Sequence, residues 1–408
     1  MGREGRLGLT RDGRLLFAAR ALRTFSFGWL SVVLALYLAR RGLSAGEIGA
    51  VFTATMAEDA TLTIVLSSMA TRIGSRRIMT WTSPLMTLGG LLLAVAHSPR
   101  VLVIGAILGT LSPNGQEAGP FSPLEQATLP ETVPPAARTR AFGWYNVFGF
   151  LPAALGSLAA GAWLWWARIL GLDDVHAYRA MLWAYAAAGA ALAVLYTGLS
   201  GTMPRASVPG RISLDALGLH RSRAVVLWLA SLQSLDALAG GFIMQGLLAY
   251  WFHIRFGVGV EALGPLFFGT NLLSAVSFLV ASRVAERVGL LNTMVFTHLP
   301  SNVLLLAVPF MPSFPLAAAV LLARHVLSQM DVPTRQAYTM ALVAPEERPA
   351  AAGITSSTRA ISQSIAPLLS GAAMTTAGTG LPFLVAGGLK IVYDLAMYAR
   401  FRSVEPRS

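Results

Sequence analysis

The chain has 408 residues, of which 55% are hydrophobic and only 12% are charged, and its mean hydropathy is +0.61. This composition excludes an ordinary soluble protein and predicts an all-α membrane protein. The absence of cysteine excludes disulfides, thiolate catalysis and cysteine-ligated metals. The formal net charge is +12, but the basic residues cluster in loops between apolar segments instead of along one face, so nucleic-acid binding is not indicated.

Apolar segments long enough to cross a bilayer follow one another along nearly the whole chain. Basic residues are concentrated in both tails and in alternate loops, so we expect the two termini in the cytoplasm. The basic N-terminus lacks a small-residue cleavage site and is expected to be an uncleaved cytoplasmic tail. Twelve transmembrane helices are predicted, at residues 16–39, 45–70, 78–97, 101–121, 141–163, 178–200, 224–251, 262–284, 290–311, 314–334, 350–373 and 380–399.

The second predicted span carries two adjacent carboxylates, Glu58 and Asp59, roughly 21 Å from its start and so near the bilayer midplane. Inserting each of them costs about 2.5 to 3.5 kcal/mol. Thr55, Asp59, Thr63 and Ser67 recur every four residues, so we expect this face of the helix to line a polar interior. Because two adjacent acids cannot both ionise cheaply, one of them is expected to gain and lose a proton near neutral pH.

The fourth predicted span is irregular, because residues 112–121 contain two prolines, two glycines and Glu117. Proline kinks a membrane helix and frees backbone carbonyls, which is tolerated where neighbours or cavity water satisfy them. Glu117 is therefore a further candidate for proton coupling. The fifth span is rich in glycine and small residues around Pro152, as close helix packing requires.

The two halves of the sequence repeat each other. Residues 67–74 and 282–289 share the pattern Ser-x-x-Ala-x-Arg-Ile/Val-Gly, and residues 123–143 and 333–353 share eight identical positions. Such similarity in equivalent places indicates a duplicated six-helix unit.

A polar segment with proline and glycine, 201–223, separates an N-terminal six-helix bundle (1–200) from a C-terminal one (224–408). Transporters with duplicated halves related by an axis along the membrane normal bind substrate between the halves. We therefore expect a substrate site near the midplane.

Three charged residues of the C-terminal half reach the middle third of the bilayer: Asp236 in span seven, Arg324 in span ten and Arg359 in span eleven. Ion pairing between helices is a structural explanation, but burying ion pairs seldom stabilises a protein on net. We take these residues as candidates for a central substrate cavity. The amides of Asn146, Asn271 and Gln245 are further candidates for this cavity, with a hydrogen bond to another helix as the alternative.

Other polar residues are interpreted structurally. Arg23 lies close enough to the cytoplasmic end of the first span to snorkel, and Glu125 is expected at the cytoplasmic rim. His298 is expected to be a satisfied interior histidine. Asp331 and Arg335 are expected to be cytoplasmic gate or capping residues, and Lys390 and Asp394, four residues apart in span twelve, are expected to be structural or to snorkel.

The loop after span two and its copy in the second half carry a family signature. The chain resembles the major facilitator superfamily along nearly its whole length, and its residues match most of that family's loop pattern Gly-xxx-Asp-Arg-x-Gly-Arg-Arg, with Ser67 and Thr71 replacing the glycine and the acid. The resemblance implies that this loop latches the cytoplasmic ends of the halves together, with Glu286 near Arg138 or Arg140. The residues placed in this gate by the resemblance are Arg72, Gly74, Arg76, Arg77, Glu286, Arg287, Gly289, Arg138 and Arg348.

These patterns predict a secondary transporter of the bacterial inner membrane that works by alternating access. The first prediction is proton-coupled antiport that exports a small amphipathic organic compound, with Glu58 and Asp59 carrying the proton and Arg324 or Arg359 as counter-charge. The alternative is import or exchange of a small anionic metabolite bound by the same two arginines. A third possibility is a transporter-derived sensor or scaffold without flux.

Phosphate-loop, metal-ligand and nucleophile–base motifs are absent from the sequence, so neither an enzyme nor an ATP-driven pump is predicted. No cofactor or metal is expected, and the proton gradient is the expected energy source. The expected partners are the lipid bilayer, protons and a small-molecule substrate, with the chain a monomer.

Overall fold

The computed structural model describes residues 8–115, 121–200, 221–376 and 379–403. These residues are largely α-helical and contain no strand. Nine of their helices are long and apolar enough to cross a membrane. The predicted all-α membrane fold is confirmed.

The chain divides into two compact units, each of which is described by itself. The N-terminal unit consists of Met1–Leu43, Ala54–Gly210 and Gly259–Phe268, and the C-terminal unit of Ser44–Thr53, Arg211–Val258 and Gly269–Ser408. Relative to the predicted halves, the start of the second span packs with the C-terminal unit and the start of the eighth span packs with the N-terminal unit.

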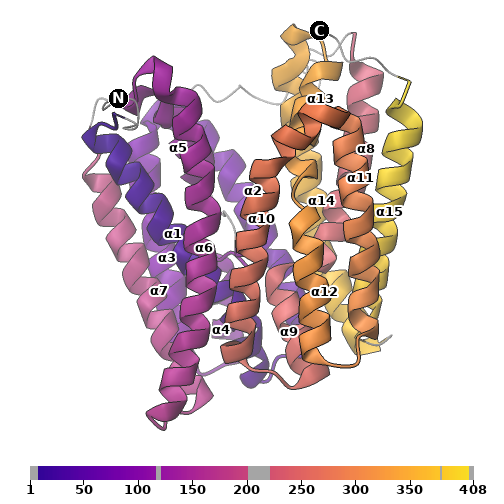
Figure 1. The fold of residues 1–408 in the computed structure, drawn as a ribbon. Coiled ribbons are helices and arrows are strands. Elements are labelled where there is room, and N and C mark those ends of the chain that lie inside the picture. The colour runs from indigo at the N-terminus through magenta and orange to yellow at the C-terminus, as the bar shows by residue number, and fades with distance from the viewer. Residues whose placement is uncertain (1–7, 116–120, 201–220, 377–378, 404–408) are drawn as a thin grey trace, which may run out of the picture. The chain divides into compact units, whose positions relative to one another are not determined.

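Long helices dominate the N-terminal unit (Figure 1). Helix α1 packs against α6 and α7, and α3 packs against α4 and α7. The bounds are α1 (Arg11–Arg40), α3 (Ser75–Val95), α4 (Pro99–Leu108), α5 (Phe121–Thr128), η1 (Leu129–Thr132), η2 (Pro135–Ala137), α6 (Arg138–Ile169) and α7 (Asp174–Thr197).

The C-terminal unit is built around α8 and α11. Helix α8 packs against α14 and α15, and α11 packs against α12, α13 and α15. The bounds are α8 (Arg223–Phe242), α9 (Gln245–Phe256), α11 (Leu290–Ala307), η4 (Val308–Phe310), α12 (Phe314–Leu327), α13 (Asp331–Leu342), η5 (Pro345–Glu347), α14 (Arg348–Thr376) and α15 (Leu381–Phe401).

Two helices belong partly to one unit and partly to the other, namely α2 (Ala45–Ile73) and α10 (Val260–Val288). Glycines explain the close packing of their first turns. A Cβ added at Gly49 of α2 would lie 2.3 Å from the Pro367 carbonyl oxygen of α14, and one at Gly264 of α10 would lie 2.6 Å from the Ser157 carbonyl oxygen of α6. Only glycine allows backbones to approach so closely.

Most predicted spans correspond to one continuous helix, but three are split. Span seven breaks at residues 243–244, one residue beyond the pair Gly240 and Gly241, which lower helix propensity. Span ten breaks at residues 328–330, between α12 and α13. In span four the helix stops at Leu108, and Glu117 lies outside the described residues.

The backbone conformation explains why the repeated loop pattern contains glycine. Gly74 follows α2 with φ 97° and Gly289 follows α10 with φ 85°, a region that side chains with a Cβ rarely adopt. At its other end, α2 begins with a reciprocal cap in which Glu47 Oε2 accepts from Ser44 N and Oγ at 2.8 Å. The sequence therefore specifies both ends of this span.

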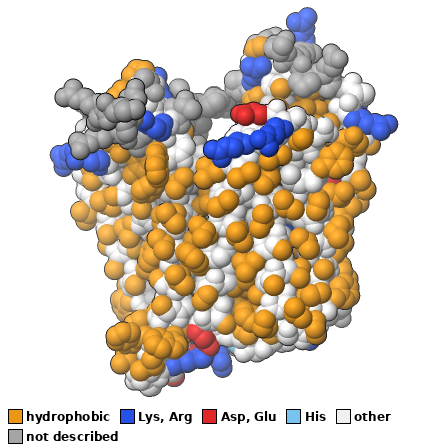
Figure 2. Space-filling model, in the orientation of Figure 1, with side chains coloured by type: hydrophobic (Ala, Val, Ile, Leu, Met, Phe, Trp, Pro, Cys, Tyr) orange, Lys and Arg blue, Asp and Glu red, His pale blue; other side chains and the backbone are white. Residues whose placement is uncertain are grey.

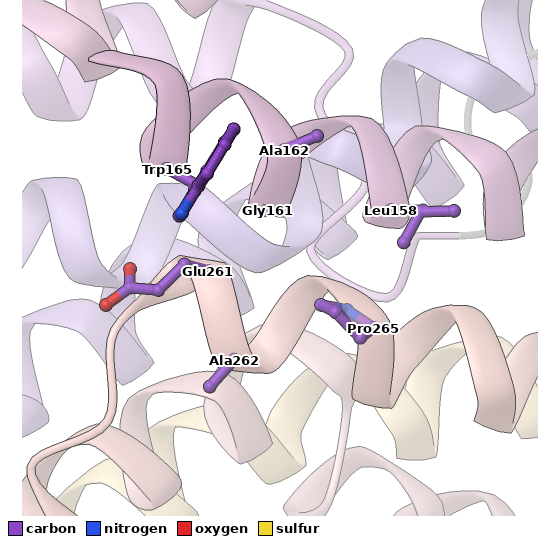
Figure 3. Close-up of a pocket in the computed structure, with 7 residues that line it drawn as sticks. All are labelled: Leu158, Gly161, Ala162, Trp165, Glu261, Ala262 and Pro265. Atoms are coloured by element: carbon purple, nitrogen blue, oxygen red, sulfur yellow. The ribbon is translucent and has the colours of Figure 1, made fainter. Parts of the chain in front are cut away.

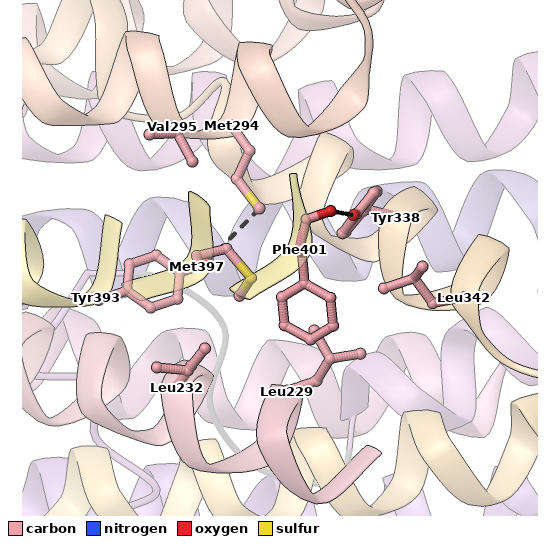
Figure 4. Packing of buried hydrophobic residues seen from close by; sticks show 9 residues of the cluster. All are labelled: Leu229, Leu232, Met294, Val295, Tyr338, Leu342, Tyr393, Met397 and Phe401. Carbon is pink, nitrogen blue, oxygen red and sulfur yellow. Dashed lines mark hydrogen bonds between the residues drawn. The ribbon is translucent and has the colours of Figure 1, made fainter. Parts of the chain in front are cut away.

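A core of nine buried hydrophobic residues joins α8, α11, α13 and α15 (Figure 4). The Tyr338 hydroxyl donates to the Phe401 carbonyl oxygen at 3.3 Å, and Tyr393 is fully buried. On the face shown in Figure 2, hydrophobic side chains cover the sides of the helices and charged ones gather towards their ends. This distribution suits a protein solvated by lipid.

Candidate functional site

Asp236 of α8 lies at the centre of a charged cluster in the C-terminal unit. Its Oδ1 accepts a hydrogen bond from Lys390 Nζ of α15 at 2.5 Å. Its Oδ2 accepts from Arg335 Nη1 of α13 at 3.2 Å and from Arg359 Nη1 of α14 at 3.1 Å. One buried carboxylate thus connects three cations from three other helices.

Arg335 has a second carboxylate partner. Its Nη1 also donates to Asp331 Oδ2, one turn earlier on α13, at 2.5 Å. Both side chains are almost fully buried, with 8% and 4% of their surface exposed. They therefore belong to the interior cluster around Asp236, whereas the sequence suggested a gate or a helix cap.

Arg324 of α12 differs from the other cations of the cluster. It is buried, and no hydrogen bond or ion pair is found for its guanidinium in the part of the chain that the structure describes. Asp236 and Asp331 are near enough to attract it, but neither forms an ion pair with it. Among the described residues the cluster contains four cations and two carboxylates, so it has an excess of positive charge. The cations are Arg324, Arg335, Arg359 and Lys390, and the carboxylates are Asp236 and Asp331.

Arg359 is the most accessible cation of this cluster. Its side chain is 27% exposed, and its Nη1 also donates to the Gln233 carbonyl oxygen at 3.2 Å. The structure thus brings together Asp236, Arg324 and Arg359, the three charged residues of the C-terminal half that the sequence singled out.

Two of the three predicted cavity amides also meet. Asn271 Nδ2 of α10 donates to Gln245 Oε1 at the start of α9, at 3.2 Å, and both residues are buried. Asn146 is exposed on α6 of the N-terminal unit. The assignment of all three to a substrate cavity stays a prediction.

Glu58 and Asp59 are half-buried on α2 in the N-terminal unit. Glu58 Oε2 is buried and has no hydrogen-bond partner among the described residues. Their predicted role in proton coupling, and the counter-charge expected from Arg324 or Arg359 of the other unit, stay predictions.

The residues of the predicted cytoplasmic gate fall into two groups. Arg138 donates through Nε to the Pro130 carbonyl oxygen at 3.2 Å, and its repeat partner Arg348 donates in the same way to the Met340 carbonyl oxygen at 2.9 Å. Arg76 Nη2 donates to the carbonyl oxygen of Thr197 at 2.8 Å. The exposed charged members are Arg72, Arg77, Glu286 and Arg287, and the pairing of Glu286 with Arg138 or Arg140 stays a prediction.

Arg23 is not a snorkelling residue, because it is completely buried and paired with Glu125 of α5. The two guanidinium-to-carboxylate distances are 2.9 Å and 2.8 Å, and neither side chain has measurable exposure. Tyr145 of α6 and Tyr196 of α7 each donate a hydroxyl hydrogen bond to Glu125 at 2.7 Å. Helix α1 begins at Arg11, more than a turn before the predicted start, so Arg23 lies deeper in the helix than expected.

A second buried polar group surrounds His298, whose interior position the sequence indicated but whose partners it did not. His298 of α11 and Asp394 of α15 are hydrogen-bonded, with 2.8 Å between Nδ1 and Oδ1, and Asn302 Nδ2 donates to Asp394 Oδ2 at 2.8 Å. The available signal was a histidine and a carboxylate in the middle of two spans, but nothing in the sequence pairs those spans. No group of three or more potential ligands that could hold a metal ion occurs in the described residues.

A groove on the N-terminal unit has a different character. It measures about 500 Å³ between α6 and the first turns of α10, and Figure 3 shows the residues that line it. Apolar groups line it almost throughout, and Glu261 is already paired with Arg168 at 2.5 Å. It therefore offers few groups for a polar substrate.

The comparisons with known proteins decide the family. The model of the Major Facilitator Superfamily matches residues 16–329. The chain belongs to the Major Facilitator Superfamily. It is therefore a multi-pass membrane protein with the fold of a transporter family.

Several known proteins are similar to this chain over nearly its full length. The uncharacterized membrane protein YJR124C of Saccharomyces cerevisiae is 24% identical over 428 residues, covering 98% of this chain and 96% of its own. The crystal structure of the nucleoside transporter NupG (D323A mutant) has a TM-score of 0.77 at 14% identity, covering 96% of this chain and 100% of its own. That of a D-xylose-proton symporter has a TM-score of 0.70 at 12% identity, covering 94% and 97%.

Proposed function

We propose that this superfamily member is a secondary transporter of a small organic anion, and that Arg324 and Arg359 of the C-terminal unit bind the anionic group. The observation that carries the proposal is Arg324, a buried cation for which the described residues supply no hydrogen-bond partner. The fold does not select this substrate class, because structures with the same fold include carriers of a nucleoside and of a sugar.

Electrostatics favours an anion at this place. A charge buried without a partner costs several kcal/mol, and a bound anion would remove that cost. A guanidinium presents a planar set of donors that matches a carboxylate or a phosphate with two parallel hydrogen bonds. Arg359 lies in the same cluster with part of its side chain exposed, so it can offer a second set of donors.

The same cluster disfavours a cationic substrate in the C-terminal unit. A cationic substrate would need a free carboxylate, but the carboxylate of Asp236 is already hydrogen-bonded to Lys390, Arg335 and Arg359. A cation there would also meet the excess positive charge of the cluster, and like charges in low dielectric repel strongly.

A second candidate function keeps the acidic pair of α2 at its centre. Glu58 has a buried carboxylate oxygen without a hydrogen-bond partner in the described residues, beside the acid of Asp59. This arrangement suits proton-coupled antiport that exports a small amphipathic cation. Proton-coupled antiport that exports such a cation is thus the second proposal.

Ligand-induced thermal stabilisation of the purified full-length protein tests the first proposal. The panel is benzoate, succinate, citrate and glycerol 3-phosphate, with uridine, xylose and tetraphenylphosphonium as neutral and cationic comparisons. We expect at least one anion to raise the melting temperature, and Arg324→Gln to weaken its binding at least tenfold, because hydrogen bonds to a charged group contribute about 1.5–3 kcal/mol.

The matched control is Arg283→Gln, which removes the same charge from an exposed position of α10 and should leave binding unchanged. Stabilisation by tetraphenylphosphonium alone, lost in the Glu58→Gln/Asp59→Asn double variant, would contradict the anion proposal and support the second candidate.

A further inference from the structure

His298 and Asp394 form a buried titratable pair that the proposed anion site does not use. They lie on α11 and α15, and their side chains are 2% and 0% exposed. Asn302, one turn after His298, is also buried and donates to the other oxygen of Asp394. Asp394 is therefore held by two neutral or cationic donors from a single helix.

The contacts of His298 Nδ1 bear on which ring nitrogen is available. Nδ1 lies 2.8 Å from Asp394 Oδ1 and 3.2 Å from Asn302 Nδ2. An ionised carboxylate only accepts hydrogen bonds, so the shorter contact favours the tautomer with the hydrogen on Nδ1. Nε2 then holds the lone pair of the neutral ring and is the atom that takes up an additional proton. No hydrogen-bond partner of Nε2 is found in the described residues.

Further polar atoms without partners occur on the same helix. Ser301 Oγ and Asn302 Oδ1 are buried and have no hydrogen-bond partner among the described residues. Buried polar groups of this kind are commonly satisfied by water, and water next to an imidazole provides a route for a proton.

The pair is electrostatically linked to the charged cluster around Asp236. Lys390, one turn before Asp394 on α15, donates to Asp236, and the ring of Tyr393 lies 6.1 Å from the His298 ring. Charged and titratable groups on the elements packed around the pair include Lys390 and Tyr393 of α15, Asp236 of α8, Arg324 and His325 of α12, Asp331 and Arg335 of α13, and Arg359 of α14. With His298 neutral these described groups and Asp394 carry an excess of one positive charge, and protonation of His298 raises the excess to two.

We infer that His298 is the site at which the C-terminal unit binds a coupling proton, with Asp394 as the positioning residue, and that this proton strengthens anion binding at Arg324 and Arg359. The inference rests on the proposed function for its second part. Because coupling between two sites is reciprocal, the bound anion also favours the proton on His298. Proton and anion then move in the same direction. The proton enters from water on one side, converts imidazole to imidazolium at Nε2, and returns to water on the other side.

The direct test is the nuclear magnetic resonance signal of the ring nitrogens in full-length, histidine-labelled protein in lipid nanodiscs. The chain has six histidines, so the His298 signal is assigned by its absence from the His298→Gln spectrum. We expect it to change from the neutral to the doubly protonated form when the pH is lowered from about 8 to about 5. A His298 signal that keeps one protonation state throughout this range would overturn the inference.

Transport in proteoliposomes separates the inference from the proposed function. The probes are the four anions of the binding panel, and the two assays are exchange without a gradient and accumulation driven by a pH gradient. We expect His298→Gln to lower accumulation at least tenfold more than exchange, and the exposed-site control His97→Gln to lower neither. Equal loss of both in His298→Gln would show a structural role and overturn the inference. Absence of anion exchange in the wild-type chain would overturn the proposed function, whereas the resonance titration still decides whether His298 binds a proton.

Discussion

In each unit a buried acid–base pair joins the first long helix to a short helix, and the two pairs have opposite polarity. In the N-terminal unit the arginine lies on α1 (Arg23) and the acid on α5 (Glu125); in the C-terminal unit the acid lies on α8 (Asp236) and the arginine on α13 (Arg335). The sequence repeat places Glu125 and Arg335 at equivalent positions. Equivalent positions of the two halves thus both carry a buried charge, but the two charges have opposite sign.

Removal of one partner tests how strongly the Arg23–Glu125 pair contributes to the stability of the folded protein. Arg23→Met leaves Glu125 buried without its cation, and we expect a loss of about 3–5 kcal/mol in the free energy of unfolding. The double variant Arg23→Met/Glu125→Leu should be more stable than the single one, because no charge is left buried. Thermal or denaturant unfolding in detergent measures both, with the exposed Arg14→Met as the control. A double variant less stable than the single one would contradict this account.

The sequence identified Asp236, Arg324 and Arg359 because a charge in the middle of an apolar span is conspicuous. It did not identify their partners. Lys390 and Arg335 pair with Asp236 across more than ninety positions in the chain, and helix-to-helix neighbours are set by tertiary packing that a single sequence does not encode in a readable pattern. His298 and Asp394 were interpreted separately for the same reason.

At the scale of elements, apolar length and loop composition predict the helices well. The second predicted span, 45–70, corresponds to α2 (Ala45–Ile73), and the repeated glycine after it marks the helix end. The helix breaks were less predictable. Span seven reads as one apolar stretch, yet it bends after Gly240 and Gly241, where low helix propensity permits a break without requiring one.

The turn after α2 provides a stability test. Gly74→Ala forces a Cβ into a backbone with φ 97°, and we expect a loss of about 1–2 kcal/mol in the free energy of unfolding. Gly46→Ala, in the first turn of the same helix, meets no atom within 4 Å and should be neutral or stabilising by up to about 1 kcal/mol. Melting temperatures of the two variants compare these effects directly. Equal melting temperatures would show that the left-handed backbone at Gly74 carries no strain.

The contact between α1 and α6 provides a second test. A Cβ at Gly156 would lie 2.0 Å from the Phe25 carbonyl oxygen, so Gly156→Ala must push two helices apart. We expect a loss of about 1–3 kcal/mol, the usual cost of overpacking. Gly143→Ala on the same helix faces open space and is the matched control. Unchanged thermal stability of Gly156→Ala would mean that this helix contact is looser than the structure shows.

At the scale of the whole molecule, the distribution of buried charge distinguishes the two transport proposals. Among the described residues, the C-terminal unit holds more interior cations than carboxylates, whereas α2 of the N-terminal unit carries two adjacent acids. Composition and repeats predicted the membrane fold, the loop pattern after span two indicated the superfamily, and the family match confirms the superfamily. The substrate class could not be read in the same way, because it depends on which cations remain unpaired after folding.

The measurement that tests the central claim most directly is uptake of the panel anions into proteoliposomes by the wild type, Arg324→Gln and Glu58→Gln/Asp59→Asn. The account predicts anion uptake that Arg324→Gln lowers at least tenfold, with a smaller effect of the double variant, because Arg324 supplies the counter-charge of the anion. Unaltered anion uptake in Arg324→Gln, or transport of tetraphenylphosphonium that only the double variant abolishes, would contradict it.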